Sequence, residues 1–248
     1  PIWVVRGRQG MSAAMTEDEA RRKLIDAALI LNDAGLGDFT RGHVSVRVPG
    51  DDAHFFMKPH SFGLDELTME NIVTCDMEGV KVAGLGRRHS EVFIHSEIFK
   101  VRPDVGAIIH AHPKYSVAFS TLDIPLLPLS QAGAEFWDGV GVYADTIDLI
   151  RSQQTGADLA KALGPRKAVF LQGHGVTVVG KTLEQCVILC MTLENACEMQ
   201  LIVESTGRKP KLFPIEDIRK LADKMGVPEI YDVNFDYLAR KAREKRGR

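Results

Sequence analysis

Hydrophobic residues recur every three to four positions along several stretches of this chain, which is the spacing of one helical face. The segment 16–35 follows this pattern and opens with Thr16 and Glu19 in capping-box spacing, so we predict an amphipathic helix there. Further helices are predicted at 90–102, at 155–164, at 182–207, which is the longest and most apolar, and once more in the polar tail beyond residue 208.

Alternation of hydrophobic and polar residues predicts strands between these helices. The predicted strand segments are 42–48, 54–59, 71–82, 106–112 and 168–180. Gly79 lies where a hairpin would turn inside the third segment, and the last segment has the pattern of a strand pair. We therefore predict that several neighbouring strands are antiparallel. The stretch 125–143 has no clear pattern.

The length and composition favour a single domain. A chain of 248 residues with 45% hydrophobic content can bury one complete core, and no internal repeat or linker divides it. We predict one domain over 16–248, preceded by an N-terminal extension over 1–15. The residues ahead of Met11 do not start with methionine, so we treat them as a processed or added end and leave them out of the fold reasoning.

Charge and cysteine content narrow the choice of partners. The formal net charge of −2 gives no concentrated basic face for nucleic acid or for a membrane surface, so we expect a small-molecule ligand. No apolar run approaches the roughly 18 to 20 residues needed to span a bilayer, and the N-terminus has no signal-peptide pattern. The four cysteines form no CxxC pair, and three of them lie in the long apolar helix, which favours packing over disulfides and a cytoplasmic protein.

Two histidines, His110 and His112, stand one residue apart in an apolar strand segment. On a strand, residues i and i+2 point to the same face about 7 Å apart, so both imidazoles can reach one metal ion. An isolated pair of this kind is more often one core histidine and one solvent-facing histidine. A third histidine, His174, lies between Gly173 and Gly175, which allow close backbone approach. Three histidines with an open position are typical of a catalytic metal site.

Glu91 is the candidate acid or base. It lies at the start of the predicted helix 90–102, where it can act as a general acid and base or as a fourth metal ligand. A carboxylate that only stabilises the helix dipole is a frequent alternative at such a position. The residues alone leave these interpretations open.

Several motifs together resemble the class II aldolase and adducin family, whose members include fuculose-phosphate aldolase and ribulose-phosphate 4-epimerase. The motifs are GHVSVRV, HSFGLDELT, HSEVFIHSEIFKVRPDVGAIIHAH and FLQGHGV, and the match runs from about residue 20 to about residue 207. The resemblance implies an α/β fold, namely a three-layer α/β/α domain around a largely antiparallel central sheet. It also implies a homotetramer with active sites at subunit interfaces.

The family's metal site corresponds to the histidines already singled out. The resemblance implies that His110, His112 and His174 bind a divalent metal, usually zinc, and that Glu91 is the catalytic acid and base. Three imidazoles with an optional carboxylate suit Zn²⁺ and Mn²⁺ alike, so both metals stay open. Adducin-like members without enzymatic activity lack these histidines, which disfavours a purely structural role.

The sequence departs from the sugar-phosphate members where those bind phosphate. It has His43 where they have an asparagine. Its PHSFG stretch, with His60 and Ser61, replaces a Thr-Gly pair, and His89 with Ser90 replaces a Ser-Ser pair. The tyrosine that follows an IP motif in the aldolases is absent from LDIPLLPLSQAG. We therefore predict that the substrate site is rebuilt for a group other than a sugar phosphate.

Two arginines suggest what that group is. Arg87 and Arg88, together with His89, place cationic and donor groups just before a helix N-terminus, a combination that suits a carboxylate. A solvated basic turn explains either arginine equally well.

Decarboxylation fits these departures better than aldol cleavage. Both reactions leave a carbanion that a metal on an adjacent oxygen stabilises, but carbon dioxide departs as a neutral fragment and needs no tyrosine to protonate it. The departures are most similar to the family's decarboxylases of hydroxylated aromatic or pyridine dicarboxylates, such as 3-hydroxy-2-methylpyridine-4,5-dicarboxylate 4-decarboxylase of vitamin B6 degradation and the dihydroxyphthalate decarboxylases. We therefore predict a carbon–carbon lyase of the carboxy-lyase type. An aldolase cleaving a sugar phosphate or hydroxy acid is the alternative, and a non-catalytic scaffold is the third.

Overall fold

One eight-stranded sheet forms the centre of the computed structural model, which describes residues 15–247. The strand order is β4-β3-β2-β1-β5-β8-β7-β6, and each neighbouring pair is antiparallel except β6 and β7. The strands are β1 (His43–Val48), β2 (Asp51–Met57), β3 (Val73–Asp76), β4 (Lys81–Ala83), β5 (Ala107–Ala111), β6 (Gly141–Tyr143), β7 (Ala168–Leu171) and β8 (Gly175–Gly180). The predicted largely antiparallel sheet is confirmed.

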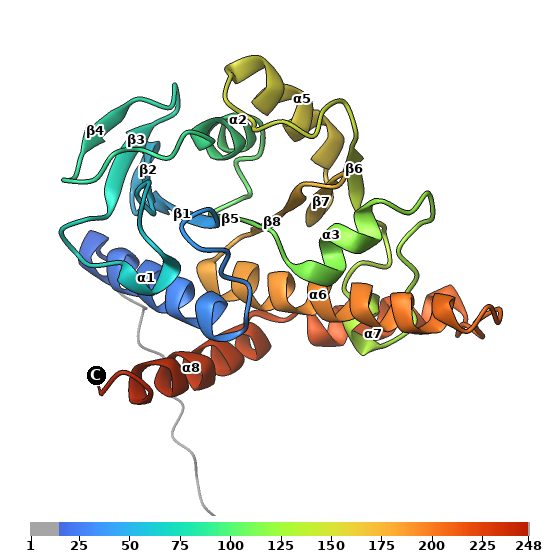
Figure 1. Cartoon of the computed structure of the whole chain (residues 1–248). Helices are drawn as coiled ribbons and strands as arrows, with labels where there is room; N and C mark the ends of the chain where they lie inside the picture. Colours follow the sequence, from blue (N-terminus) through green and yellow to red (C-terminus); the bar gives the residue numbers. More distant parts are fainter. Residues whose placement is uncertain (1–14, 248) are drawn as a thin grey trace, which may run out of the picture.

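Helices cover both faces of this sheet and make the predicted three layers (Figure 1). One face carries α1 (Glu17–Asp33), α6 (Leu183–Ser205) and α8 (Pro228–Glu244), and the other carries α2 (Val92–Val101) and α5 (Gln153–Leu163). The remaining elements are η1 (Leu64–Glu66), α3 (Lys114–Ser120), α4 (Gln131–Ala134) and α7 (Ile215–Met225). The predicted capping box of α1 is present, since Thr16 and Glu19 bond reciprocally.

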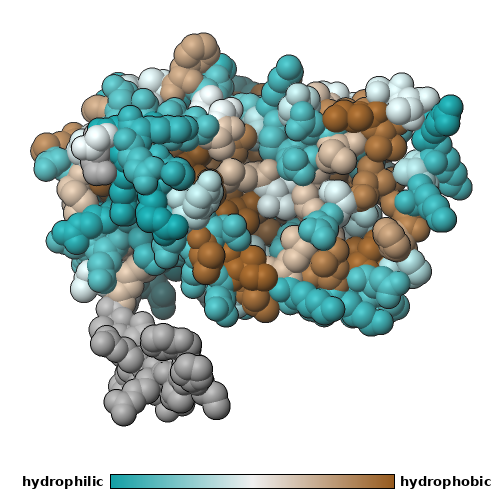
Figure 2. Space-filling model, turned by 90° about the horizontal axis from the view of Figure 1, so that it is seen from below, coloured by the Kyte–Doolittle hydropathy of each residue, from teal (hydrophilic) through white to brown (hydrophobic). Residues whose placement is uncertain are grey.

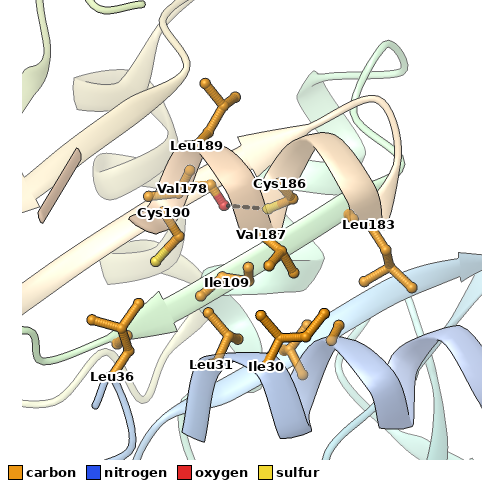
Figure 3. Packing of buried hydrophobic residues seen from close by; sticks show 14 of the residues in the cluster. Ile30, Leu31, Leu36, Ile109, Val178, Leu183, Cys186, Val187, Leu189 and Cys190 are labelled. Atoms are coloured by element: carbon orange, nitrogen blue, oxygen red, sulfur yellow. Dashed lines mark hydrogen bonds between the residues drawn. The ribbon is translucent and has the colours of Figure 1, made fainter. Parts of the chain in front are cut away.

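The larger hydrophobic core lies between the sheet and α6. Figure 3 shows Leu183 and Val187 of this helix beside Ile30 of α1 and Ile109 of β5. Cys186 lies in the same layer and donates a hydrogen bond from its thiol to the Val178 carbonyl, at 3.3 Å. All four cysteines are buried and free, so the prediction that they pack rather than pair is confirmed.

By length and mean hydropathy, α6 is the one described helix that could cross a membrane. The prediction that no segment reaches that threshold is therefore wrong for Leu183–Ser205. This helix is apolar on nearly all sides because it packs against the sheet, α1, α3 and α8 at once. We interpret it as the central helix of the domain.

Two parts of the chain differ from the prediction. The tail forms two helices instead of one, because Pro228 fits the first turn of a new helix, α8, directly after α7 ends at Met225. The unpatterned stretch contains α4 and the edge strand β6, which are too short to show a period. The predicted N-terminal extension lies outside the described residues apart from Met15.

Strand register brings the chemically interesting residues to one end of the sheet. His43 of β1 is the direct partner of His110 in β5, and His110 is in turn the partner of Thr177 in β8. Glu91 is the N-cap residue of α2, which packs on the face of the sheet opposite to α6. Residues far apart in the sequence therefore meet across three adjacent strands and one helix end.

Candidate active site

His110, His112 and His174 converge, with one ring nitrogen from each within 4.8 Å of the others. His110 is in β5 and His112 follows the end of that strand, so their Nε2 atoms lie 3.2 Å apart. His174 lies in the tight turn between β7 and β8. A Cβ at Gly175 would lie 2.6 Å from the Ala111 carbonyl oxygen and 2.8 Å from the ring of His112, so only glycine permits this approach.

The outward nitrogens of two of these rings have partners. His110 Nδ1 lies 3.2 Å from Thr177 Oγ1. His112 Nδ1 lies 3.0 Å from Asp38 Oδ2, close enough for an ion pair although not aligned as a hydrogen bond. Such outer partners fix ring orientation at metal sites and leave Nε2 free to ligate.

The three residues fit a divalent cation. Both ring nitrogens of His174 are buried without a hydrogen-bond partner, which is costly unless a ligand satisfies them. Burial lowers the pKa of His174 to about 4, lowers the pKa of His110 well below its usual range, and also lowers the pKa of His112. All three are therefore neutral near pH 7 and offer lone pairs, as transition-metal binding requires.

Glu91 is buried between this cluster and His43. Its Oε1 accepts a hydrogen bond from the Ile150 N–H at 3.0 Å and lies 3.8 Å from His174 Nε2. Its Oε2 lies 3.6 Å from His43 Nε2 and 4.0 Å from His110 Nε2. Burial raises the pKa of Glu91 to about 6, so the group can gain or lose a proton near neutral pH.

A cavity of about 590 Å³ opens in front of these groups, a volume that suits a small ring compound. Its wall includes Glu91, His112 and His174. The predicted residues that also line it are His60, His89 and Ser90. The wall also contains three cations that the sequence analysis did not select, namely Arg41, Lys114 and Arg151.

The remaining predicted residues lie around this cavity in different ways. His43 is fully buried behind it, with its ring centroid 4.0 Å from that of His89. Ser61 is exposed in a left-handed conformation and hydrogen-bonds His60, at 2.6 Å. Arg87 and Arg88 line an adjoining hollow, which shares His60 and Ser90 with the main cavity. His60, His89 and Ser90 therefore line the main cavity, whereas Arg87 and Arg88 line the adjoining hollow.

Seven of the eight histidines lie in this region, and His54 is the one outside it. The sequence analysis missed His95, which is fully buried and hydrogen-bonded to His43. Its signal was the four-residue spacing from Glu91, which puts both side chains on one helical face. Asp38 and Arg41 had no such signal, because they lie in a loop without period.

Acid is expected to destabilise the metal-free protein through these buried rings. Burial lowers the pKa of His95 to about 3, so below about pH 6.5 the unfolded chain binds a proton that the folded chain does not. This stabilising contribution is complete above the unfolded pKa and is lost as the pH falls toward 3. His95→Gln should therefore reduce the slope of unfolding free energy against pH by about 1.4 kcal/mol per unit. Urea unfolding between pH 4.5 and 6.5 measures it, and an unchanged slope would contradict it.

Asp38→Asn is expected to weaken metal binding by about 10- to 100-fold, because the weaker acceptor no longer orients His112. Competition with a chelator of known affinity measures the change. Asp51→Asn is the matched control, since Asp51 Oδ2 lies 2.7 Å from Nδ1 of His54, outside the cavity. Equal metal affinity in both variants would show that Asp38 has no such role.

Comparison with known proteins extends these observations. The family described as Class II Aldolase and Adducin N-terminal domain matches residues 22–201. The 3,4-dihydroxyphthalate decarboxylase of Arthrobacter keyseri is 30% identical over 223 residues, covering 86% of this chain and 90% of that protein. Decarboxylase NovR of Streptomyces niveus is 31% identical over 215 residues, covering 85% and 79%.

The fold agrees with the same family. The solved structure of L-fuculose 1-phosphate aldolase from Glaciozyma antarctica matches with a TM-score of 0.82 and 26% identity, covering 93% of this chain and 91% of that chain. The resemblance stated from the motifs is confirmed. The chain belongs to the class II aldolase and adducin family, and it is a lyase.

Proposed function

We propose that this lyase is a metal-dependent decarboxylase of a hydroxylated aromatic dicarboxylate. Within that class, the narrower candidate is a 3-hydroxypyridine dicarboxylate of vitamin B6 degradation. The observation that carries the proposal is the buried Glu91 carboxyl beside three converging neutral imidazoles, at a cavity whose wall also contains the cations Arg41, Lys114 and Arg151. The two decarboxylase relatives support the reaction type.

Class II aldolases depend on a divalent metal, and in our proposal His110, His112 and His174 hold Zn²⁺ or Mn²⁺ here. When bound, the ion supplies a Lewis acid that stabilises negative charge developing on substrate oxygens next to the bond that breaks. Glu91 is our candidate for the proton donor, with a role as fourth ligand as the alternative.

In this proposal the bond between the ring carbon and one carboxylate breaks, and carbon dioxide leaves. The bonding electrons stay on the ring carbon, and the protonated Glu91 carboxyl delivers a proton to that carbon. The Ile150 N–H, which donates to Glu91 Oε1, holds the carboxyl in place during the transfer. The buried position of Glu91 keeps water away from the proton that it delivers.

The second carboxylate of the substrate is retained. We propose that it binds near His89, Ser90 and His60, which all line the main cavity. His60 and Ser90 also border the hollow of Arg87 and Arg88. The ring of His43 packs against the ring of His89 and supports it from behind, and Ser61 orients the ring of His60 through their hydrogen bond. This arrangement gives a dicarboxylate an advantage over a monocarboxylate, because donors to a charged group bind more strongly.

We also propose that residues 16–248 act as one catalytic domain in a cytoplasmic homotetramer whose active sites lie at subunit interfaces. Hydrophobic side chains gather on the surface that carries α6, α7 and α8 (Figure 2). On these helices, Met199 and Ile202 of α6 and Val233 and Tyr237 of α8 are exposed in the single chain. Covering such a surface is a common reason for symmetric assembly. Light scattering at micromolar concentration tests this, and a monomer would contradict it.

The test of the function is carbon dioxide release from a panel of hydroxylated aromatic and pyridine dicarboxylates, after removal and return of Zn²⁺ or Mn²⁺. We expect turnover of at least one dicarboxylate and much slower turnover of its monocarboxylate analogue. An aldehyde product from a sugar phosphate or hydroxy acid, without carbon dioxide, would instead support the aldolase alternative. Equal turnover of the monocarboxylate would contradict the proposed binding of the second carboxylate.

A further inference from the structure

A line of hydrogen bonds runs through the protein behind Glu91. Ser45 Oγ lies 2.5 Å from His95 Nδ1, and His95 Nε2 lies 2.6 Å from His43 Nδ1. The other nitrogen of His43, Nε2, has no hydrogen-bond partner and lies 3.6 Å from Glu91 Oε2. The line therefore connects a serine hydroxyl, through two imidazoles, to the candidate proton donor.

Secondary structure fixes each member of this line. His43 and Ser45 are two residues apart in β1, so they point to the same face of the sheet. His95 and Glu91 are one helical turn apart on α2, so both point toward that face. The ring of Phe55 stacks on His95 with an interplanar angle of 17°, which restricts rotation of the imidazole.

All three members are completely enclosed by protein. Ser45 and His95 are 0% exposed and His43 is 1% exposed. Water cannot serve as a substitute partner there, and each neutral imidazole has one N–H donor and one acceptor nitrogen. The direction of the hydrogen bonds is consequently determined by the groups at the two ends.

When Glu91 is ionised, one direction aims every proton of the line at an acceptor. If Ser45 donates to His95, then His95 donates from Nε2 to His43, and the His43 proton lies on Nε2 and points at the Glu91 carboxylate. In the reverse direction, the Ser45 hydroxyl proton has no acceptor among the described residues, because the ring of His95 is its one side-chain hydrogen-bond partner there. With Glu91 ionised, the reverse direction also aims a lone pair of His43 at a carboxylate oxygen, which is unfavourable.

We propose that Ser45 and His95 are positioning residues that hold His43 as the Nε2–H tautomer, with this N–H directed at Glu91 Oε2. His43 then orients the Glu91 carboxyl from the side opposite the Ile150 N–H. Neither Ser45 nor His95 lines the cavity, so both act through His43. The catalytic consequence rests on the proposed function, whereas the tautomer itself does not.

The tautomer is measured directly by solid-state ¹⁵N spectroscopy of the zinc-loaded protein labelled at histidine, with the His43 signals assigned from a His43→Asn sample. We expect wild-type His43 to be a single Nε2–H form. His95→Phe, which keeps a ring but has no donor, should give a mixture or the Nδ1–H form. His95→Gln should restore the Nε2–H form, because an amide N–H can donate to His43 Nδ1.

Activity gives the second measurement. We expect His95→Phe and Ser45→Ala to lower kcat by about 10- to 100-fold, as is typical for residues that orient a functional group, with KM changed less than about twofold. His95→Gln and Ser45→Thr should recover most of kcat. His54→Phe is the control, because His54 lies outside the cavity and pairs with Asp51.

The outcomes separate the two proposals. An Nδ1–H form of His43 in the wild type, or His43 signals that are unchanged in both His95→Phe and Ser45→Ala, would overturn the inference. If His95→Phe does not fold, Ser45→Ala alone decides it, because this substitution leaves the packing of Phe55 against His95 untouched. The expected spectra without carbon dioxide release from any dicarboxylate would support the positioning role and contradict the decarboxylase.

Discussion

Replacing His174 with alanine is expected to remove the bound divalent ion and to reduce turnover by more than about 100-fold. Mutation of a residue that hydrogen-bonds a metal ligand typically lowers metal affinity or activity by about 10- to 100-fold, so loss of a ligand itself should lower both by more. The substitution removes no hydrogen bond within the protein, since neither ring nitrogen of His174 has a hydrogen-bond partner there. Metal content per chain after dialysis, measured by mass spectrometry, checks this result together with carbon dioxide release.

His110→Ala and His112→Ala should behave in the same way, because their Nε2 atoms face the same point. His54→Ala is the matched control, since it also removes an imidazole but leaves the cavity intact. The thermal midpoint of each metal-free variant tests for a general loss of folding. Full metal content in His174→Ala would refute the proposed ligand set.

Glu91→Gln is expected to reduce kcat by about 10²- to 10⁴-fold, the usual contribution of a general acid or base. KM should change little, because the glutamine amide oxygen can still accept the Ile150 N–H and the cavity keeps its shape. Steady-state kinetics on a dicarboxylate substrate provides the measurement.

Metal content distinguishes the two roles open to Glu91. Unchanged metal affinity in Glu91→Gln would support the proton donor, and weaker affinity would support the fourth ligand. Glu97→Gln is the control on the same helix, because Glu97 bonds Lys100 and does not line the cavity. A Glu91→Gln enzyme with wild-type kcat would exclude both roles.

Most of the fold could be predicted because its elements are long or strongly periodic. The α1 and α6 helices, and the alternation of Val44 with Ser45 along β1, depend on local spacing that sheet and helix packing preserves. The short α4 and β6 could not be predicted, since four and three residues do not complete a recognisable period. Their positions depend on contacts with α6 and β7 instead.

The candidate site was predictable where its residues are close in sequence or flanked by glycines. His110 and His112 share a strand face, and Gly173 with Gly175 marks His174. Arg41 and Arg151 reach the cavity from loops whose course depends on tertiary packing, so no local pattern points to them. The hydrogen bond between His95 and His43 joins residues 52 positions apart, so no local pattern points to it either.

The register that pairs β5 with β8 also determines when the site can exist during folding. It brings together His110 and Thr177, which are 67 residues apart, so the proposed metal ligands meet only after distant segments have closed into one sheet. An ion that needs all three imidazoles therefore binds the finished domain and cannot nucleate its assembly. Added zinc should consequently lengthen the lifetime of the folded state by slowing unfolding, while the refolding rate stays the same.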